Sequence, residues 1–445
     1  MTADTNAPQI LVVGGGYVGM YTALCLQRRL RRGEATVTVV TEQPNMTYQP
    51  LLAEAASGLV EPRQVVVPLR RVLRRCRVLV GEVSAVDHPR RVATAVLPGG
   101  EQVRLPYDVL VLAPGSVSRT LPVPGLVEVG IGFKTVGEAI YLRNQVLSRL
   151  DEASSTEDPE RRRRALTFVF VGGGYAGIEA LGELEDMARH AVRFHPGLRR
   201  PELRWVLVEA ADRILPELSR SLADYTVQRL RERGVEVRLE TRVESMVDGH
   251  VVLSDGARFD AGTVVWTAGV KAHPLAARSG LPVDHTGRVV CTPDLRISGT
   301  EGAWSAGDGA AVPDLSRRDT PGALCGPTAQ HAVRQARRMA DNIVAVLRGR
   351  RPRPYRHADL GSVASLGLHQ GVAELLGVKL RGRPAWYLHR AYHLSRVPTL
   401  DHKVRVLAGW TLALFLRREV VSLGQLQHPR REWESAARQT APASR

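Results

Sequence analysis

The chain has 445 residues, which is long for one domain and suits two or three. Its 61 lysines and arginines outnumber 45 aspartates and glutamates. The formal charge of +16 predicts an anionic partner such as nucleic acid, a membrane surface or a phosphorylated ligand, unless it only solubilises the surface. Four cysteines lie far apart, at Cys25, Cys76, Cys291 and Cys325, so the sequence contains no C-x-x-C metal or redox pair.

The N-terminal residues are polar and lead directly into an apolar run at 10–13. We therefore expect no secretory signal peptide and a reducing, cytoplasmic location. No segment approaches the roughly 20 apolar residues of a membrane-spanning helix, so we expect the chain to touch a membrane at most. No histidine spacing suggests a metal site.

The first glycine-rich motif follows that apolar run as Gly14-Gly15-Gly16-Tyr17-Val18-Gly19. In a G-x-G-x-x-G turn the first glycine permits the bend, the second lets a pyrophosphate approach, and the third packs the helix on the strand. A strand at 36–41 ends in Glu42, an acid placed to bind ribose hydroxyls. The helix after Gly19 should end at the arginines before Gly33, a typical stop signal.

The middle of the chain repeats this pattern. We expect a strand at 105–113 followed by a sharp turn at 113–116, and a polar surface linker at 151–164. A second motif, Gly172-Gly173-Gly174-Tyr175-Ala176-Gly177, follows the apolar run 168–171, and the strand at 204–208 ends in Glu209. The same pattern predicts a helix near 219–233, strands at 236–239 and 251–253, and a strand and turn at 263–270 that echo 110–116.

Two such motifs, each with its acid, predict an α/β chain with two Rossmann-like domains that hold two dinucleotides. The usual purpose of that arrangement is hydride transfer. A carboxylate at Glu209 should repel a 2′-phosphate and favour NADH, although Arg213 is a nearby cation.

The C-terminal part is basic and aromatic. From Arg381 onward, twelve basic residues stand against four acidic ones, a difference of +8. The segment 404–416 carries Trp410, Leu414 and Phe415 between cationic residues, which suits a helix lying in a membrane interface or one packed in a core or a dimer.

At this point the chain resembles the flavoprotein reductases with two nucleotide domains, in which the NAD domain is inserted in the FAD domain. The Ser-Ala-Gly-Asp segment at 305–308 resembles their second FAD motif. Within that superfamily, further segments are similar to the type II NADH:quinone oxidoreductases, and the likeness runs in order from about residue 8 to 427. These segments are 45–52, 264–270, 327–335, 361–367 and 377–382.

The resemblance implies the following boundaries. They are an FAD-binding domain at 8–120 and 286–350, a connecting helix and linker at 121–160, an NAD(H)-binding domain at 161–285, a C-terminal membrane-associating and dimerisation unit at 351–430, and a flexible tail at 431–445.

The resemblance and the motifs together give a set of candidate site residues. Those for non-covalent FAD are Gly14, Gly15, Gly16, Tyr17, Gly19, Glu42 (or Thr41, if the acid is displaced by one), Gln49, Ala113, Gly115, Asp308, Ala329 and Gln330. Those for NADH are Gly172, Gly174, Gly177, Glu179, Glu209, Ala268 and Gly269. The resemblance implies catalytic roles for Glu179 and Gln330 beside the flavin and quinone. Glu179 could instead stabilise the first turn of its helix, and Gln330 could be an ordinary surface residue.

The resemblance further implies a quinone as acceptor, a peripheral place on anionic lipid at the cytoplasmic face of the cell membrane, a homodimer, and no nucleic-acid partner. A soluble NAD(P)H-dependent reductase of a ferredoxin-type carrier stays open, because such a carrier is acidic. A flavin- or NADH-binding sensor, or a basic nucleic-acid-binding protein, is the non-enzymatic alternative and rests on charge alone. The scattered cysteines argue against sulfide:quinone and disulfide reductases.

Overall fold

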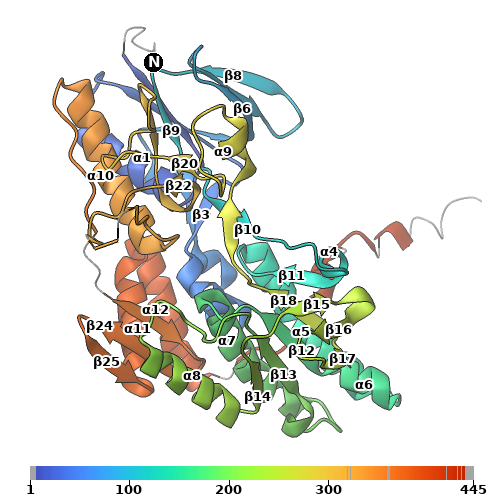
Figure 1. Cartoon of the computed structure of the whole chain (residues 1–445). Coiled ribbons are helices and arrows are strands. Elements are labelled where there is room, and N and C mark those ends of the chain that lie inside the picture. The colour runs from blue at the N-terminus through green and yellow to red at the C-terminus, as the bar shows by residue number, and fades with distance from the viewer. Residues whose placement is uncertain are drawn as a thin grey trace, which may run out of the picture. The chain divides into compact units, whose positions relative to one another are not determined.

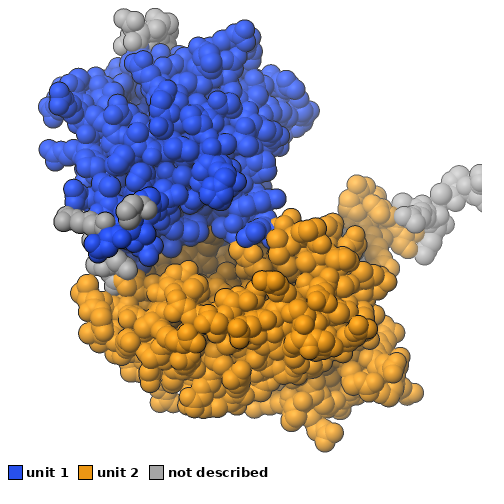
Figure 2. All heavy atoms as spheres, viewed as in Figure 1, with its two compact units in different colours: residues 1–47, 66–119, 270–359 blue, residues 48–65, 120–269, 360–445 orange. Residues whose placement is uncertain are grey.

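A computed structural model describes residues 7–317, 319–320, 322–357, 361–416, 418–427, 429–431 and 433–435. The chain divides into two compact units, coloured in Figure 2. Unit 1 comprises 1–47, 66–119 and 270–359, and unit 2 comprises 48–65, 120–269 and 360–445. Most of the tail expected at 431–445 lies outside the described residues.

Unit 1 is built on a five-stranded parallel sheet with the fingerprint strand at its centre, and Figure 1 labels one of its strands, β9 (Val109–Leu112). In sheet order the strands are β21 (Ala303–Ser305), β9, β1 (Gln9–Val13), β2 (Thr36–Thr41) and β5 (Arg77–Val80). Residues 10–13 are buried without alternation, as expected for a parallel strand covered on both faces. The helices α1 (Tyr17–Arg29) and α10 (Ala329–Leu347) pack against each other.

Smaller elements complete unit 1. They are an antiparallel sheet of β6 (Glu82–Asp87), β7 (Val92–Val96) and β8 (Gln102–Pro106), the pairs β3 (Asn45–Thr47) with β4 (Val66–Pro68), β10 (Ser116–Ser118) with β19 (Val270–Ala272) and β20 (Val289–Val290) with β22 (Ala310–Ala311), the helices α3 (Leu69–Val72) and α9 (Pro274–Arg278), and the 3₁₀ turn η6 (Gly307–Gly309).

Unit 2 repeats this strand order, except that one edge strand precedes the fingerprint in the chain, whereas β21 of unit 1 follows it. Its parallel sheet runs in the order β11 (Gly130–Gly132), β18 (Thr263–Trp266), β12 (Thr167–Val171), β13 (Arg204–Val208) and β14 (Val235–Arg238). An antiparallel sheet of β15 (Val243–Ser245), β16 (His250–Leu253) and β17 (Arg258–Asp260) matches β6–β8 of unit 1. The predicted α/β fold with two Rossmann-like cores is confirmed.

The helices of unit 2 lie partly between the strands of this sheet along the chain and partly before or after them. They are α2 (Leu52–Ala56), α4 (Leu126–Val129), α5 (Val136–Ser155), α6 (Pro159–Ala165), α7 (Tyr175–Ala191), α8 (Arg220–Glu232), α11 (Arg383–Arg396) and α12 (Leu400–Phe415). The C-terminal segment adds an antiparallel sheet of β23 (Ser362–Ser365), β24 (Gly371–Leu375) and β25 (Val378–Arg381), and it belongs to unit 2.

Two local expectations were wrong. The strand expected at 105–113 is interrupted, because β8 pairs in the antiparallel sheet whereas β9 joins the parallel sheet, and the chain changes sheets at 107–108. The linker expected at 151–164 is largely helical. Asp158 caps α6 by accepting hydrogen bonds from the N–H groups of Glu160 and Arg161, and Pro159 occupies its first position.

Within the described residues, no helix combines the length and the apolar composition needed to cross a membrane.

Candidate active site

The first fingerprint has the shape that a dinucleotide pyrophosphate requires. Gly14 has φ of 104°, and a Cβ there would overlap the carbonyl of Ala113. A Cβ at Gly19 would overlap the carbonyl of Gly14, so strand and helix pack closely. A Cβ at Gly16, in contrast, would have no atom within 4 Å. The open position is therefore the one at which a phosphate must approach the backbone.

The acid expected to bind ribose in the first site, Glu42, does not occupy the same position as Glu209 in the second site. The backbone N–H of Gly14 donates to Val40 O, and that of Gly172 donates to Val208 O. Thr41 in unit 1 therefore occupies the place that Glu209 has in unit 2. Glu42 lies one residue further, with its carboxylate 3.8 Å from His273 Nε2. Binding of FAD by Glu42 remains a prediction.

The segment around Asp308, which the resemblance assigns to FAD, is tied to β10 and to α10 of unit 1. Ser116 Oγ donates to Asp308 Oδ2 at 2.8 Å. The N–H of Gly307 donates to Gln335 Oε1 at 2.8 Å, which ties this turn to α10. The Thr328 side chain caps α10, so Ala329 and Gln330 form its first turn. The Asp308 turn also contacts the fingerprint helix, since a Cβ added at Gly307 would lie 2.6 Å from Val18 of α1. The structure thus brings the fingerprint helix, the Asp308 turn and the start of α10 together.

The second fingerprint repeats the geometry in unit 2. Gly172 has φ of 111°, and a Cβ there would lie 2.6 Å from Thr267 O and 2.9 Å from Ala268 N. A Cβ at Gly177 would overlap Gly172 O, whereas Gly174 has no atom within 4 Å of its Cβ position. The turn at Ala268 and Gly269 is therefore packed against the fingerprint, as its echo in the sequence predicts.

Glu209 is held in place by backbone donors. Its Oε2 accepts from the N–H of Gly173 at 2.6 Å and its Oε1 from the N–H of Ala211 at 2.8 Å. The guanidinium of Arg213 donates to Pro216 O at 2.6 Å. The acid therefore sits at the edge of the cradle with its orientation fixed.

The candidate residues form two sets. The first fingerprint, Asp308 and Gln330 belong to unit 1, whereas the second fingerprint, Glu179 and Gln49 belong to unit 2. Gln49, placed by the resemblance near FAD, donates from its Nε2 to Lys134 O at 3.3 Å.

Glu179 does not stabilise a helix end. It is the fifth residue of α7, whose first turn holds no acid, so the placement in the first turn was wrong. Its Oε1 lies 3.1 Å from His389 Nε2 and accepts from the N–H of Ser365 at 3.1 Å. The side chain of His389 is 1% exposed and that of Glu179 is 12% exposed. The carboxylate is therefore fixed by a histidine that sequence reasoning missed.

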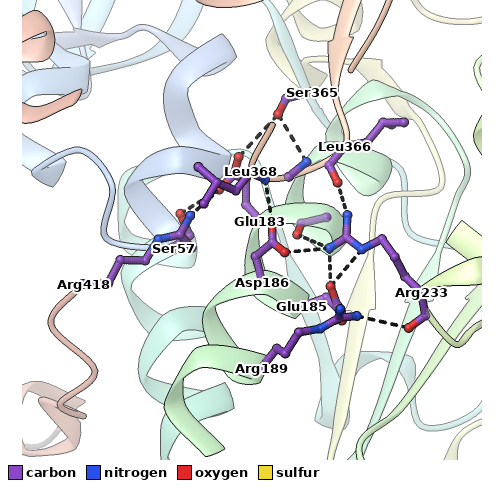
Figure 3. A network of polar contacts seen from close by, with 12 residues as sticks. Ser57, Glu183, Glu185, Asp186, Arg189, Arg233, Ser365, Leu366, Leu368 and Arg418 are labelled. Atoms are coloured by element: carbon purple, nitrogen blue, oxygen red, sulfur yellow. Dashed lines mark hydrogen bonds and ion pairs between the residues drawn. The ribbon is translucent and has the colours of Figure 1, made fainter. Parts of the chain in front are cut away.

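Two more acids, Glu183 and Asp186, follow Glu179 on α7 at helical spacing, and Figure 3 shows both with their partners. Glu183 accepts from Ser57 Oγ at 3.1 Å and pairs with Arg418 at 3.6 Å. Asp186 pairs with Arg233 at 3.2 Å and accepts from the N–H of Leu368. Burial raises the pKa of Asp186 to about 6, although Arg233 opposes the shift.

Comparison with known proteins agrees with this geometry. Residues 8–336 match the family model of the pyridine nucleotide-disulphide oxidoreductases. A type II NADH:quinone oxidoreductase of Mycobacterium tuberculosis is 30% identical over 92% of this chain and 89% of its own length. A protein of the same description from Staphylococcus aureus is 30% identical over 86% of this chain and 93% of its own length.

The chain belongs to the type II NADH:quinone oxidoreductases. The family and enzyme class expected from the sequence are thereby confirmed. A solved structure described as NDH2 from Plasmodium falciparum in complex with NADH superimposes with a TM-score of 0.87 over 94% of this chain and 100% of its own. At 17% identity, that similarity concerns the fold.

The C-terminal helices of this type II oxidoreductase contact a further buried acid. Glu54 of α2 is fully buried, and burial raises its pKa. It lies 3.6 Å from Arg390 and accepts from the indole N–H of Trp410. Trp410, expected to face a membrane, is therefore buried inside unit 2 instead.

Helical spacing could have revealed part of this cluster. Glu179, Glu183 and Asp186 are four and three residues apart, and His389 and His393 are four apart, so each set shares one helix face. Nothing in the sequence says that these two faces meet. The sequence also gave no signal for the burial of Glu54.

Proposed function

We propose that this chain oxidises NADH through bound FAD and passes two electrons to a membrane quinone without pumping protons. The observation that carries the proposal is the repeated cradle. Gly16 and Gly174 are each open at the Cβ position, while the glycines around them are tightly packed. Both cradles fit a dinucleotide, and FAD with NADH is the pair that family membership supports.

The residues would divide the work as follows. The N–H groups at the start of α1 and α7 would hold the pyrophosphates, Asp308 the ribityl chain, and Glu209 the ribose hydroxyls of NADH. FAD, when bound, accepts a hydride and releases electrons to an acceptor. The N-terminus of α10 would stabilise negative charge, with Gln330 in its first turn.

The exposed face of α12 supports a membrane acceptor. Large apolar side chains recur at helical spacing along it, and more than half of each is exposed except at Leu407, which is 50% exposed. They are Leu400, Val404, Leu407, Leu414 and Phe415. The cations Lys403 and Arg405 lie on the same helix. Such a face suits a helix lying flat on anionic lipid.

We therefore propose peripheral attachment at the cytoplasmic face, where a lipid-soluble quinone can reach the enzyme. A second copy of the chain could cover part of the same face, and a homodimer is included in the proposal. A ferredoxin-type carrier would have no use for this exposed apolar helix.

Steady-state oxidation of NADH by the purified flavoprotein tests the proposal. We expect turnover with menaquinone or ubiquinone analogues. Gln330→Ala should slow reoxidation of the flavin by quinone more than its bleaching by NADH. A protein that binds FAD and NADH but turns over no quinone analogue would contradict the proposal.

A further inference from the structure

The acids along one face of α7 have different kinds of partner. Asp186 pairs with Arg233 and Glu183 with Arg418, and a guanidinium stays charged at every physiological pH. Glu179, next in the row, has His389 as its partner at 3.1 Å. Imidazole can be neutral near pH 7, so Glu179 is the acid in this row whose partner does not hold it permanently ionised.

The surroundings of His389 favour the neutral form. Its Nε2 faces Glu179, whereas its Nδ1 is buried and has no hydrogen-bond partner among the described residues. A second ring proton, on Nδ1, would be buried without an acceptor, which is costly. The tautomer with the proton on Nε2 satisfies the contact to Glu179.

The other groups around His389 leave this assignment intact. Glu54 from α2 acts on it electrostatically but is paired with Arg390 of α11. His393, one turn along α11, has a pKa well below its usual value, chiefly because it is buried. From β23 the approaching group is the neutral Ser365, and α12 presents the indole of Trp410 to Glu54.

We infer that His389 is a neutral hydrogen-bond donor that positions Glu179 for reversible protonation during quinone reduction. His389 and Ser365 both donate to Oε1 of Glu179, so Oε2 can gain and lose a proton while these two bonds persist. His389 is thus a positioning residue, and the inference rests on the function proposed above.

The proton balance is complete. The hydride of NADH brings two electrons and one proton equivalent, and a quinol needs two electrons and two protons. The carboxyl O–H bond of Glu179 breaks, the second quinol O–H bond forms, and the carboxylate takes its proton back from water.

Three full-length holoenzyme variants separate this role from others. His389→Gln keeps an amide N–H donor near the Nε2 position, and His389→Leu removes the donor at similar volume. His402→Gln alters another buried histidine, on α12, that bonds the helix cap Thr399. One readout is the pH profile of flavin reoxidation by a quinone analogue. The other is the infrared carboxyl band of the oxidised protein, assigned by its loss in Glu179→Gln.

We expect the infrared carboxyl band of Glu179 to show the same pH dependence in His389→Gln and His402→Gln as in the wild type. His389→Leu should raise the midpoint of the Glu179 band by about one pH unit, because a donor to the carboxylate is lost. It should also slow reoxidation roughly tenfold, with bleaching by NADH unchanged.

Two results would overturn the inference. One is a wild-type titration in His389→Leu. The other is a loss in His389→Gln as large as that in His389→Leu, which would make His389 a proton carrier. If quinone fails to reoxidise the wild-type flavin, the proposed function is wrong. The infrared titration still tests whether His389 donates a hydrogen bond to Glu179.

Discussion

Glu209 accepts a hydrogen bond from the backbone N–H of Gly173 at 2.6 Å, so the acid at the end of β13 is tied to the fingerprint turn after β12. In unit 1 the equivalent position holds Thr41, whose hydroxyl donates to Gln43 O at 3.1 Å. The two cradles therefore share their glycine geometry and differ in the group at the ribose edge. A carboxylate fixed in that position favours a ribose with free hydroxyls.

This difference predicts a preference for NADH. A 2′-phosphate would meet the Glu209 carboxylate, and Arg213 is engaged with Pro216 O. We expect kcat/KM for NADH to exceed that for NADPH roughly tenfold or more, about 1.4 kcal/mol. Glu209→Gln should lower the ratio of kcat/KM for NADH to kcat/KM for NADPH. Asp224→Asn, on an exposed part of α8, should leave this ratio unchanged. Equal kcat/KM values in the wild type would count against the assignment.

The open glycines predict selective losses of each cofactor. Gly16→Val should abolish FAD retention, because the side chain would fill the space left for the pyrophosphate. Gly174→Val should keep FAD and raise the Kd for NADH, since it fills the second cradle. Gly137→Val, where the nearest atom to an added Cβ is Thr135 Oγ1 at 3.9 Å, is the control outside both fingerprints. Full flavin content in purified Gly16→Val would show that the first site is misassigned.

Asp186 predicts a pH dependence of stability. Burial raises its pKa from 3.8 to about 6 in the folded protein. The folded state therefore binds this proton more tightly, and the contribution to stability is present below about pH 4 and lost as pH rises through about 6. Asp186→Asn does not titrate, so its Tm should rise relative to the wild type between pH 4 and pH 7. This rise relative to the wild type corresponds to a difference in the free energy of unfolding on the order of 2 kcal/mol.

The matching control is again Asp224→Asn, which should follow the wild type at every pH. A Tm difference between Asp186→Asn and the wild type that stays constant from pH 4 to pH 7 would refute the role of this carboxyl.

The α12 face predicts salt-sensitive lipid binding. Full-length protein should float with anionic liposomes at low salt, because charge attraction fades as the Debye length shortens. Leu407→Asp and Leu414→Asp should weaken flotation, since each exposed leucine supplies roughly 1.5–3 kcal/mol when buried in lipid. Val127→Asp, 86% exposed on α4, is the control. Indifference to anionic liposomes at low salt would remove the physical support for a membrane quinone.

Local sequence patterns predicted much of the fold. Glycine spacing gave both cradles, because each turn is set by residues within ten positions of one another. The same holds for α8 and for the strand β18, which echoes β9. The break between β8 and β9 was missed, because it depends on which sheet each half joins and not on local composition.

The site was harder to predict because its partners are distant in sequence. Glu179 meets His389, and Glu54 meets Trp410, through the packing of α11 and α12 against α2 and α7. Trp410 was assigned to the wrong face because α12 is apolar on more than one side, and periodicity alone does not select the side that is buried.

The central claim is that electrons from NADH reach a quinone through the bound flavin. An anaerobic single-turnover experiment tests it most directly. The holoenzyme is bleached with one equivalent of NADH and then mixed with a menaquinone analogue or with oxidised ferredoxin. The account predicts that flavin absorbance returns rapidly with the quinone and stays bleached with ferredoxin. Rapid recovery with ferredoxin and none with the quinone would contradict it.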